Sequence, residues 1–531
     1  MCAPGPRRMR RGHIVSAICE SCRCMHRYRM CPALVVVALM GLALLPPRAL
    51  GAAPAGCAAV AAHRTHPAIE ALDPRPGAPR IFAMQYKQEA RNVVSLGRFR
   101  TKIDCMLRTY VLPHLARSRP NVVVFNEDIG LAALGIGSRG RVARDVIAHR
   151  GGPSCHPDSE PCGALGAISA LTAAYSRPVT AYARRLRGFA RLSRIFVAAT
   201  DTTARGFLAT FSALAKRYRL YMIGSGDLPA FVQSRTRADR DAFADPDLRP
   251  APKSVYVATS PRVYNQVFMW GPRDVRRRGP DVLRNVVASN RKVPLTALEL
   301  ALGLEPGPSR GPAALANLRP FALPGTRARL GFATSLPAFT YGEPARGVDP
   351  CGDTARYYMR CLDELGANLV IQDEANPGAW TGPDGNGIER WQPLSWMSST
   401  YRAVSDPSVH FDYNVTAMMV GNLSDLVFDG QSAITQRGLA GVRRCHYIGN
   451  RAFVAGEDQA MFRRYAGAQA GFLALAPWVV GDRSRAALRR VGSELAPGSG
   501  SRLENDYVET ALIADLPFPV DRRRPGCASG R

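Results

Sequence analysis

The sequence predicts an α/β protein, and three neighbouring segments carry this prediction. Residues 80–86, RIFAMQY, form a short apolar run typical of a buried strand. Residues 99–118 repeat apolar side chains at helical spacing, and residues 121–128, NVVVFNED, are a β-branched run that ends in polar residues. A strand, a helix and a second strand in succession indicate helices packed against a sheet.

The same kinds of element recur as far as residue 519, so we expect one continuous domain over residues 80–519. The patterns predict helices at 202–220 and 354–365, and strands at 221–227, 263–272, 327–336, 368–376, 413–423, 428–435 and 508–519. Residues 129–197 are rich in Gly, Ala and Arg and are expected to form an insertion that carries helices.

The N-terminal residues resemble an export signal. Residues 33–45, ALVVVALMGLALL, follow several arginines and precede a small-residue stretch, which is the order of a secretory signal peptide. Thirteen apolar residues are short for a membrane span, which needs roughly 20. We therefore expect residues 1–51 to be a signal peptide, with an uncleaved anchor that associates with the membrane as the alternative.

Two further segments flank the predicted domain. Residues 52–79 are rich in Ala, Pro and Gly and are predicted to be a linker, and residues 520–531 form a basic tail. An exported chain can form disulfides. Cys155 and Cys162 bracket a short polar loop and are the pair that the spacing favours, whereas the other pairings cannot be deduced.

The formal charge of +28 does not indicate a nucleic-acid partner here. The arginines are scattered along the chain, without a dense basic stripe or a nucleic-acid-binding motif. Of the 70 basic residues only five are lysines, and Lys292 is one of them. A lysine that persists among so many arginines suggests a site that needs a compact ammonium group rather than a planar guanidinium.

Three residues in a particular order suggest nucleophilic chemistry. Glu127 stands at a predicted strand end, Lys292 follows, and Cys351 comes just before a predicted helix. A carboxylate can take the proton of a thiol, the thiolate can attack a carbonyl or nitrile carbon, and an ammonium can stabilise the charge that develops. The amides of the following helix would lower the pKa of the cysteine.

The order of these motifs resembles the nitrilase, or carbon–nitrogen hydrolase, superfamily. The resemblance runs in the family's order from about residue 80 to 518, and each motif by itself is weak. The matching stretches are RIFAMQY (80–86), VVVFNED (122–128), RLYMIGSG (219–226), VYNQVFMWGP (263–272), NRKVPL (290–295), the Cys-x-Asp motif with its helix and following strand (351–380), and FDGQSAIT (428–435).

The resemblance implies a four-layer αββα sandwich whose subunits pair into a homo-oligomer. It implies hydrolysis of a non-peptide amide or nitrile without a metal or another cofactor. Glu127 would be the general base, Lys292 the transition-state stabiliser and Cys351 the nucleophile. Glu299 would stand near the family's supporting acid, in contact with the substrate pocket. Glu374, Asn376 and Trp380 follow a strand end and are further candidates to line that pocket.

One departure from the family pattern leaves the nucleophile open. The family's nucleophile follows its strand directly, and here Ser335 occupies that point, whereas Cys351 comes after a further stretch. We favour Cys351, because the Gly and Asp after it preserve the Cys-x-Asp motif. Two alternatives to a hydrolase remain. They are an exported binding protein that has lost the nucleophile, and an N-acyltransferase, against which the single short apolar run counts.

Overall fold

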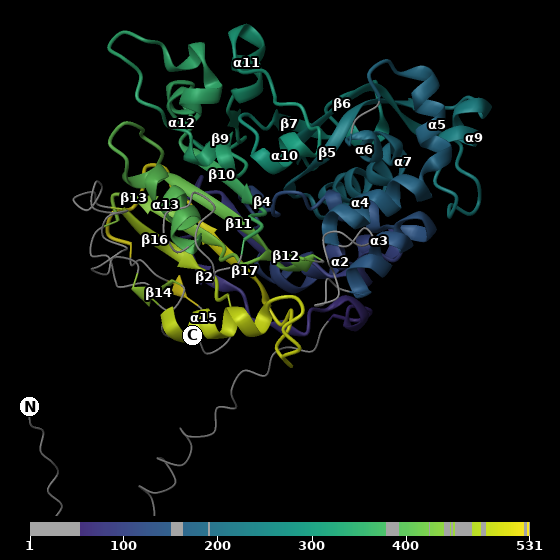
Figure 1. The fold of residues 1–531 in the computed structure, drawn as a ribbon. Helices are drawn as coiled ribbons and strands as arrows, with labels where there is room; N and C mark the ends of the chain where they lie inside the picture. Colours follow the sequence, from purple (N-terminus) through teal and green to yellow (C-terminus); the bar gives the residue numbers. More distant parts are fainter. Residues whose placement is uncertain are drawn as a thin grey trace, which may run out of the picture. The chain divides into compact units, whose positions relative to one another are not determined.

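The computed structural model describes residues 54–149, 163–189, 192–378, 392–423, 425–439, 446–447, 450–451, 470–478, 485–524 and 528–529. It is a mixed α/β fold (Figure 1). Within this described part, no helix is both long and apolar enough to cross a bilayer. The loop between Cys155 and Cys162 and the predicted signal peptide lie outside the described residues.

The strands join mainly through parallel neighbours at the centre of the sheet. β11, β3, β4 and β5 are consecutive and parallel, while β6 and β7 extend this order antiparallel. The strands are β1 (Arg64–Thr65), β2 (Ile69–Ala71), β3 (Arg80–Lys87), β4 (Asn121–Val124), β5 (Tyr221–Ser234), β6 (Val255–Trp270), β7 (Val286–Arg291), β8 (Phe321–Ala322), β9 (Arg329–Phe332), β10 (Leu369–Glu374), β11 (Tyr413–Leu423), β12 (Leu426–Phe428), β13 (Ala433–Arg437), β14 (His446–Tyr447), β15 (Asn450–Arg451), β16 (Ala470–Leu475), β17 (Val508–Asp515) and β18 (Ala528–Ser529).

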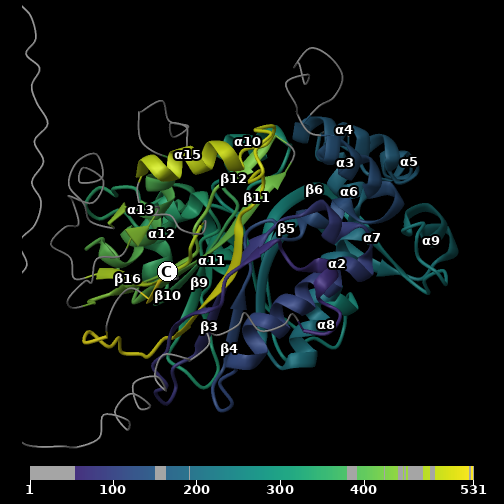
Figure 2. The same cartoon turned by 90° about the horizontal axis from the view of Figure 1, so that it is seen from below.

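The helices form groups on either side of these strands. Figure 1 shows α3, α4, α5 and α9 gathered beside β5 and β6, and Figure 2 shows α2 close to α8. Their bounds are α2 (Leu96–Met106), α3 (Gly137–His149), α4 (Gly163–Ala174), α5 (Ser176–Arg185), α6 (Arg194–Ala198), α7 (Thr200–Thr203), α8 (Ala209–Tyr218), α9 (Arg237–Phe243), α10 (Ala297–Ala301), α11 (Gly311–Leu318), α12 (Thr354–Glu364), α13 (Gln392–Ser405) and α15 (Arg485–Leu495).

Alternate side chains of the central strands enter two separate cores. On β3, Phe82 and Met84 pack into a core with residues of α2 and α8, whereas Ile81 and Ala83 face residues of β9, β10 and β11. Successive side chains of a strand point to opposite faces of the sheet. Both faces of β3 are therefore covered, which explains why every one of its residues is buried.

The segment that we predicted to be a linker belongs to the domain from residue 54 onward. β1 and β2 pair with β17 in parallel register, and Cys57 is linked to Cys105 of α2 by a disulfide. The prediction was wrong because it rested on Ala, Pro and Gly content. Two strands of two and three residues are too short to show an alternating pattern, and their partner β17 lies more than 400 residues further along the chain.

The predicted elements of the central region are confirmed, with longer or shorter bounds. β5 and β6 run well beyond the predicted strands because they pair with each other as a long antiparallel hairpin. The insertion over residues 129–197 carries helices in its described parts. The carboxyl ends of β4, β9 and β10 position the candidate site, because polar residues follow each of these strands.

Candidate active site

Glu127 lies just past the carboxyl end of β4, and its side chain is almost completely buried. Its Oε1 atom accepts hydrogen bonds from Lys292 Nζ at 2.7 Å and from Asn265 Nδ2 at 2.8 Å. Its Oε2 atom accepts from the Ala375 backbone N–H at 3.1 Å. Three donors from three separate segments of the chain thus hold the carboxylate, which is how a buried acid is made tolerable.

Lys292 directly follows β7, and its ammonium contacts two carboxylates. The Nζ atom is 2.7 Å from Glu127 and 2.9 Å from Glu299. Burial by itself lowers the pKa of Lys292, but the two carboxylates outweigh burial and raise that pKa above its ordinary value. Glu127 and Lys292, which are 165 residues apart in the sequence, are thus in direct contact. A compact ammonium suits this place, because both acceptors converge on a single point.

Glu299 both caps a short helix and contacts Lys292. It belongs to the short helix α10, where its Oε2 atom accepts hydrogen bonds from the backbone N–H and the hydroxyl of Thr296 in a capping box. The same atom lies beside Lys292. Although burial opposes it, Lys292 and the N–H of Thr296 hold the pKa of Glu299 below its ordinary value. Glu299 is therefore the ionised partner of Lys292.

Sequence reasoning missed Asn265, a residue of β6 that joins both acids. Its Nδ2 atom donates to Glu127 Oε1 at 2.8 Å and to Glu299 Oε1 at 2.9 Å. Its backbone carbonyl accepts from the N–H of Lys292 at 2.9 Å. The available signal was an amide residue inside the apolar run VYNQVFMW, where a buried polar side chain needs partners.

The Glu127 carboxyl is poised to exchange a proton near neutral pH. Burial raises its pKa, Lys292 lowers it, and repulsion from Glu299 and Asp373 raises it again, so that the pKa of Glu127 is about 7. A carboxyl with such a pKa is present in both its acid and its base form at neutral pH. This is the property that general acid–base chemistry needs.

Ser335 is held in a backbone conformation that only glycine adopts readily. It follows β9 by three residues, with φ of 55° and ψ of −115°, and it is 4% exposed. Its N–H donates to the Asp373 carbonyl, and its hydroxyl donates to Asn376 Oδ1 at 3.3 Å. A non-glycine residue with this φ is strained, and such strain is concentrated at functional sites.

Ser335 and Glu127 belong to one site, because the same short segment holds both. Glu127 accepts from Ala375 N–H, while Asp373 and Asn376 on either side of Ala375 both contact Ser335. This segment lies at the carboxyl end of β10, which pairs in parallel with β9. A strained serine at the end of one strand is thus tied to the buried acid at the end of another.

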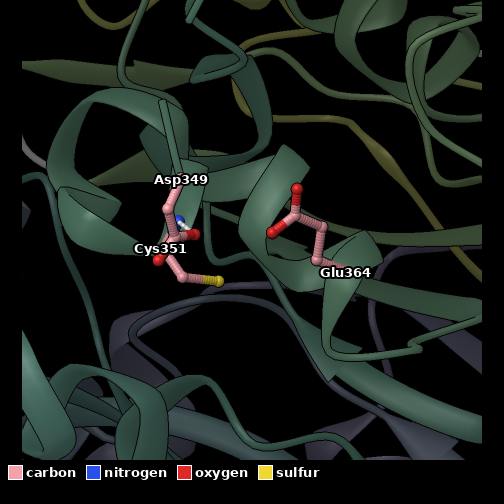
Figure 3. Close-up of side chains that lie close together, drawn as sticks. All are labelled: Asp349, Cys351 and Glu364. Carbon is pink, nitrogen blue, oxygen red and sulfur yellow. Dashed lines mark hydrogen bonds between the residues drawn. The ribbon is translucent and has the colours of Figure 1, made fainter. Parts of the chain in front are cut away.

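Cys351 does not have the thiol that we predicted as the nucleophile. It forms a disulfide with Cys361 of α12, and a disulfide sulfur is not a thiolate. Figure 3 shows Cys351 beside Asp349 and Glu364. Ligand atoms of these three lie within 4.8 Å of one another, but the sulfur is already bonded to Cys361 and is not a thiolate ligand.

Glu374, at the end of β10, is a further buried acid of the site. Its Oε1 atom accepts from Gln372 Nε2 at 2.6 Å, and among the described residues its Oε2 atom has no hydrogen-bond donor. Burial and the nearby Glu127 carboxyl raise the pKa of Glu374 to about 8. Asn376 contacts Ser335, as described above. Trp380 lies outside the described residues.

Comparisons with known proteins were made by family models, by sequence and by structure. No family model matches the chain, and no curated protein matches it. The solved structures that match include amidases and a carbon–nitrogen hydrolase. They include an amidase from Nesterenkonia sp. AN1 described as belonging to the nitrilase superfamily (TM-score 0.32, 14% identity, covering 68% of this chain and 85% of that one). A carbon–nitrogen hydrolase from Helicobacter pylori G27 also matches (TM-score 0.33, 10% identity, covering 68% and 81%).

The structure is similar to nitrilase-superfamily proteins at a low level of identity. The geometry of Ser335, Glu127 and Lys292 is observed in this chain itself, and the proposed chemistry rests on that geometry.

The disulfide between Cys351 and Cys361 predicts how the two cysteines react. Iodoacetamide should label neither of them in the native protein without reductant, and both after unfolding and reduction. Peptide mapping by mass spectrometry measures this. The Cys351→Ala/Cys361→Ala variant should lose about 2–4 kcal/mol of unfolding free energy. Labelling of Cys351 in the native, non-reduced protein would contradict the disulfide.

The raised pKa of Glu374 predicts that the stability difference between Glu374→Gln and wild type depends on pH. Its pKa is about 8 in the folded state against an ordinary value of 4.5, so the folded state keeps a proton that the unfolded state releases. Its contribution to stability therefore falls as pH rises from about 4.5 to 8. The unfolding free energy of Glu374→Gln minus that of wild type should rise over this range, by about 1.4 kcal/mol for each pKa unit realised. Denaturant titrations at pH 5 and pH 8 measure it. If the unfolding free energies of both proteins changed equally with pH, Glu374 would have an ordinary pKa in the folded state.

Proposed function

We propose that this protein is a carbon–nitrogen hydrolase whose nucleophile is Ser335. The observation that carries the proposal is the strained backbone of Ser335 at a strand end, tied through residues 373–376 to the buried Glu127–Lys292 pair. A nucleophilic serine held on a sharp strand-to-helix turn exposes its hydroxyl for attack. Here the short 3₁₀ helix Leu336–Phe339 follows Ser335 directly.

The proposed reaction proceeds in two balanced steps. The carboxylate form of Glu127 takes the proton of the Ser335 hydroxyl as the serine oxygen bonds to the carbonyl carbon of an amide. The C–N bond then breaks, and Glu127 returns the proton to the leaving amine. Water, activated by Glu127 in the same way, hydrolyses the resulting ester and restores the serine. The Lys292 ammonium stabilises the negative charge of each tetrahedral intermediate.

The site compensates in two ways for using a hydroxyl in place of a thiol. A serine hydroxyl is a much weaker acid than a cysteine thiol and needs an adjacent base. Burial raises the pKa of Glu127 to about 7, which makes its carboxylate a stronger base than an ordinary one. Burial also strengthens the attraction between the Lys292 ammonium and developing charge, because little water is present to screen it.

The fold and the location of the protein belong to the same proposal. One face of β3 packs in a core with α2 and α8, and the other face packs in a core with β9, β10 and β11. These two cores support a four-layer αββα sandwich. The apolar run at 33–45 and the disulfides Cys57–Cys105 and Cys351–Cys361 support export to an oxidising compartment. An amide small enough for a buried site is the substrate class that we favour, and pairing of subunits remains part of the proposal.

A binding protein without turnover is the second candidate, and the hydroxyl at the turn favours it. A site that has exchanged a thiol for a hydroxyl keeps its shape and its hydrogen bonds but loses the better nucleophile. The two candidates differ in a measurable way, since a binding protein would hold small amides without releasing an amine.

Substitution of the proposed nucleophile tests the hydrolase. Ser335→Ala should lower kcat for small amides by at least about a thousandfold, because no other hydroxyl replaces the attacking atom. Ammonia release from a panel of amides measures it. Cys351→Ala/Cys361→Ala is the control and should keep the wild-type kcat once its folding is verified. Equal turnover by wild type and Ser335→Ala would remove Ser335 from the mechanism, and no turnover by wild type would leave the binding protein.

The proton balance of Glu127 sets the expected pH profile. Because the base form is needed and the pKa is about 7, kcat/KM should rise about tenfold per pH unit below pH 7 and level off above it. The pKa of Lys292 is raised, so its ammonium stays charged throughout this range. Steady-state kinetics from pH 5 to pH 9 measure the profile, and Glu127→Gln should lose most of the activity at every pH. A flat wild-type profile would contradict the role of Glu127.

A further inference from the structure

Asp227 lies in a row of side chains that leads across the sheet to Lys292. In the antiparallel ladder of β5 and β6, Asp227 stands directly opposite Asn265. On the other side of β6 the ladder with β7 ends where Gln266 pairs with Arg291, and the next residue, Lys292, donates its N–H to the Asn265 carbonyl at 2.9 Å. Directly opposed residues in a sheet project their side chains to the same face. Asp227 therefore faces the same side as Asn265 and Lys292.

Asp128 joins Asp227 because the turn after β4 lies directly against β5. The N–H of Asp128 donates to the Ser225 hydroxyl at 3.0 Å, and the N–H of Gly130 donates to the Ser225 carbonyl at 2.9 Å. A side chain on Gly226 would place its Cβ only 3.0 Å from the Gly130 Cα, so the approach depends on glycine at 226. Asp128 itself has φ of 56°, which turns the chain back toward β5.

The two aspartates have acceptor atoms that nothing described in the chain satisfies. Asp227 is 6% exposed, and neither its Oδ1 atom nor that of Asp128 has a hydrogen-bond donor among the described residues. Burial raises the pKa of both groups well above the ordinary value, and repulsion adds to it, from Asp227 on Asp128 and from Glu299 and Glu127 on Asp227. A buried acceptor without a donor destabilises the folded state, and it persists where a ligand supplies the partner.

Acidic side chains outnumber basic ones around the site. Asp128, Asp227, Asp373 and Glu374 lie with Glu127 and Glu299 in one electrostatically connected group, and Lys292 is the cation that acts on them. That ammonium is already shared between Glu127 and Glu299. Among the described residues, no second positive charge therefore acts on Asp128 and Asp227, in a chain whose formal charge is +28.

We propose that Asp128 and Asp227 form a subsite for an organic cation, an ammonium or guanidinium group, carried by the substrate whose amide reaches Ser335. This inference rests on the proposed function for the amide part of that substrate. The cationic group would donate hydrogen bonds to the two free Oδ1 atoms and supply the missing charge. The predicted substrate class is thus an amide with a basic group at its far end.

Binding of two matched amides to the Ser335→Ala protein tests the subsite without turnover. The probes are 4-aminobutanamide and pentanamide, which have the same length and differ in the terminal ammonium or methyl group. Calorimetric titration should show the cationic amide binding at least about tenfold more tightly. Asp227→Asn and Asp128→Asn, each made in the Ser335→Ala background, should bring the preference close to one. Two separate variants are used so that one misfolded protein does not decide the result.

The control is Asp241→Asn, which removes an exposed carboxylate on α9 and should keep the preference. Equal binding of the two amides would overturn the subsite. Stoichiometric binding of calcium or magnesium chloride that Asp227→Asn abolishes would also overturn it, by assigning the pair to a metal. Failure of the hydrolase looks different: wild type would then prefer 4-aminobutanamide in binding but release no ammonia. Hydrolysis of both amides with the same KM would keep the hydrolase and reject the subsite.

Discussion

The candidate site depends on one ammonium group that is shared by two buried carboxylates. Lys292 contacts Glu127 and Glu299 at 2.7 and 2.9 Å, and a buried charge of either sign is costly unless it is paired. Asn265 bridges the same two acids, and the capping box of α10 uses one of them. The same cation therefore holds the Glu127 carboxylate and favours ionisation of Glu299, and Glu299 in turn caps the start of α10.

This arrangement also explains which parts of the site the sequence could predict. Glu127 and Lys292 were predictable, because a charged residue directly after an apolar strand lies at the sheet edge and a lysine among 65 arginines is unusual. The Thr-x-x-Glu spacing of Thr296 and Glu299 is a readable capping box. Asn265 was harder to predict, since its role depends on the register of three strands and not on its neighbours in the chain.

The choice of a candidate nucleophile shows where motif spacing and strand geometry disagree. The Cys-x-Asp motif favoured Cys351. In the structure, however, β9 ends at Phe332, and the turn after this strand is at Ser335. The chain continues through a separate stretch to Cys351, which lies in the short 3₁₀ helix Pro350–Gly352 just before α12 and bonds to Cys361 inside α12. The distance between two cysteines depends on how a loop meets a helix, and sequence spacing does not contain that information.

An excess of buried acids gives the serine site a property that a single ion pair would not have. Glu127, Glu374, Asp128 and Asp227 all have raised pKa values, so the resting site holds protons that can move when a ligand changes the local charge. An incoming cation favours ionisation of the neighbouring carboxyls, and the base form of Glu127 is the form that we propose to activate Ser335. A cationic substrate would thus help to ionise the proposed base that activates Ser335, whereas a neutral amide of the same size would not.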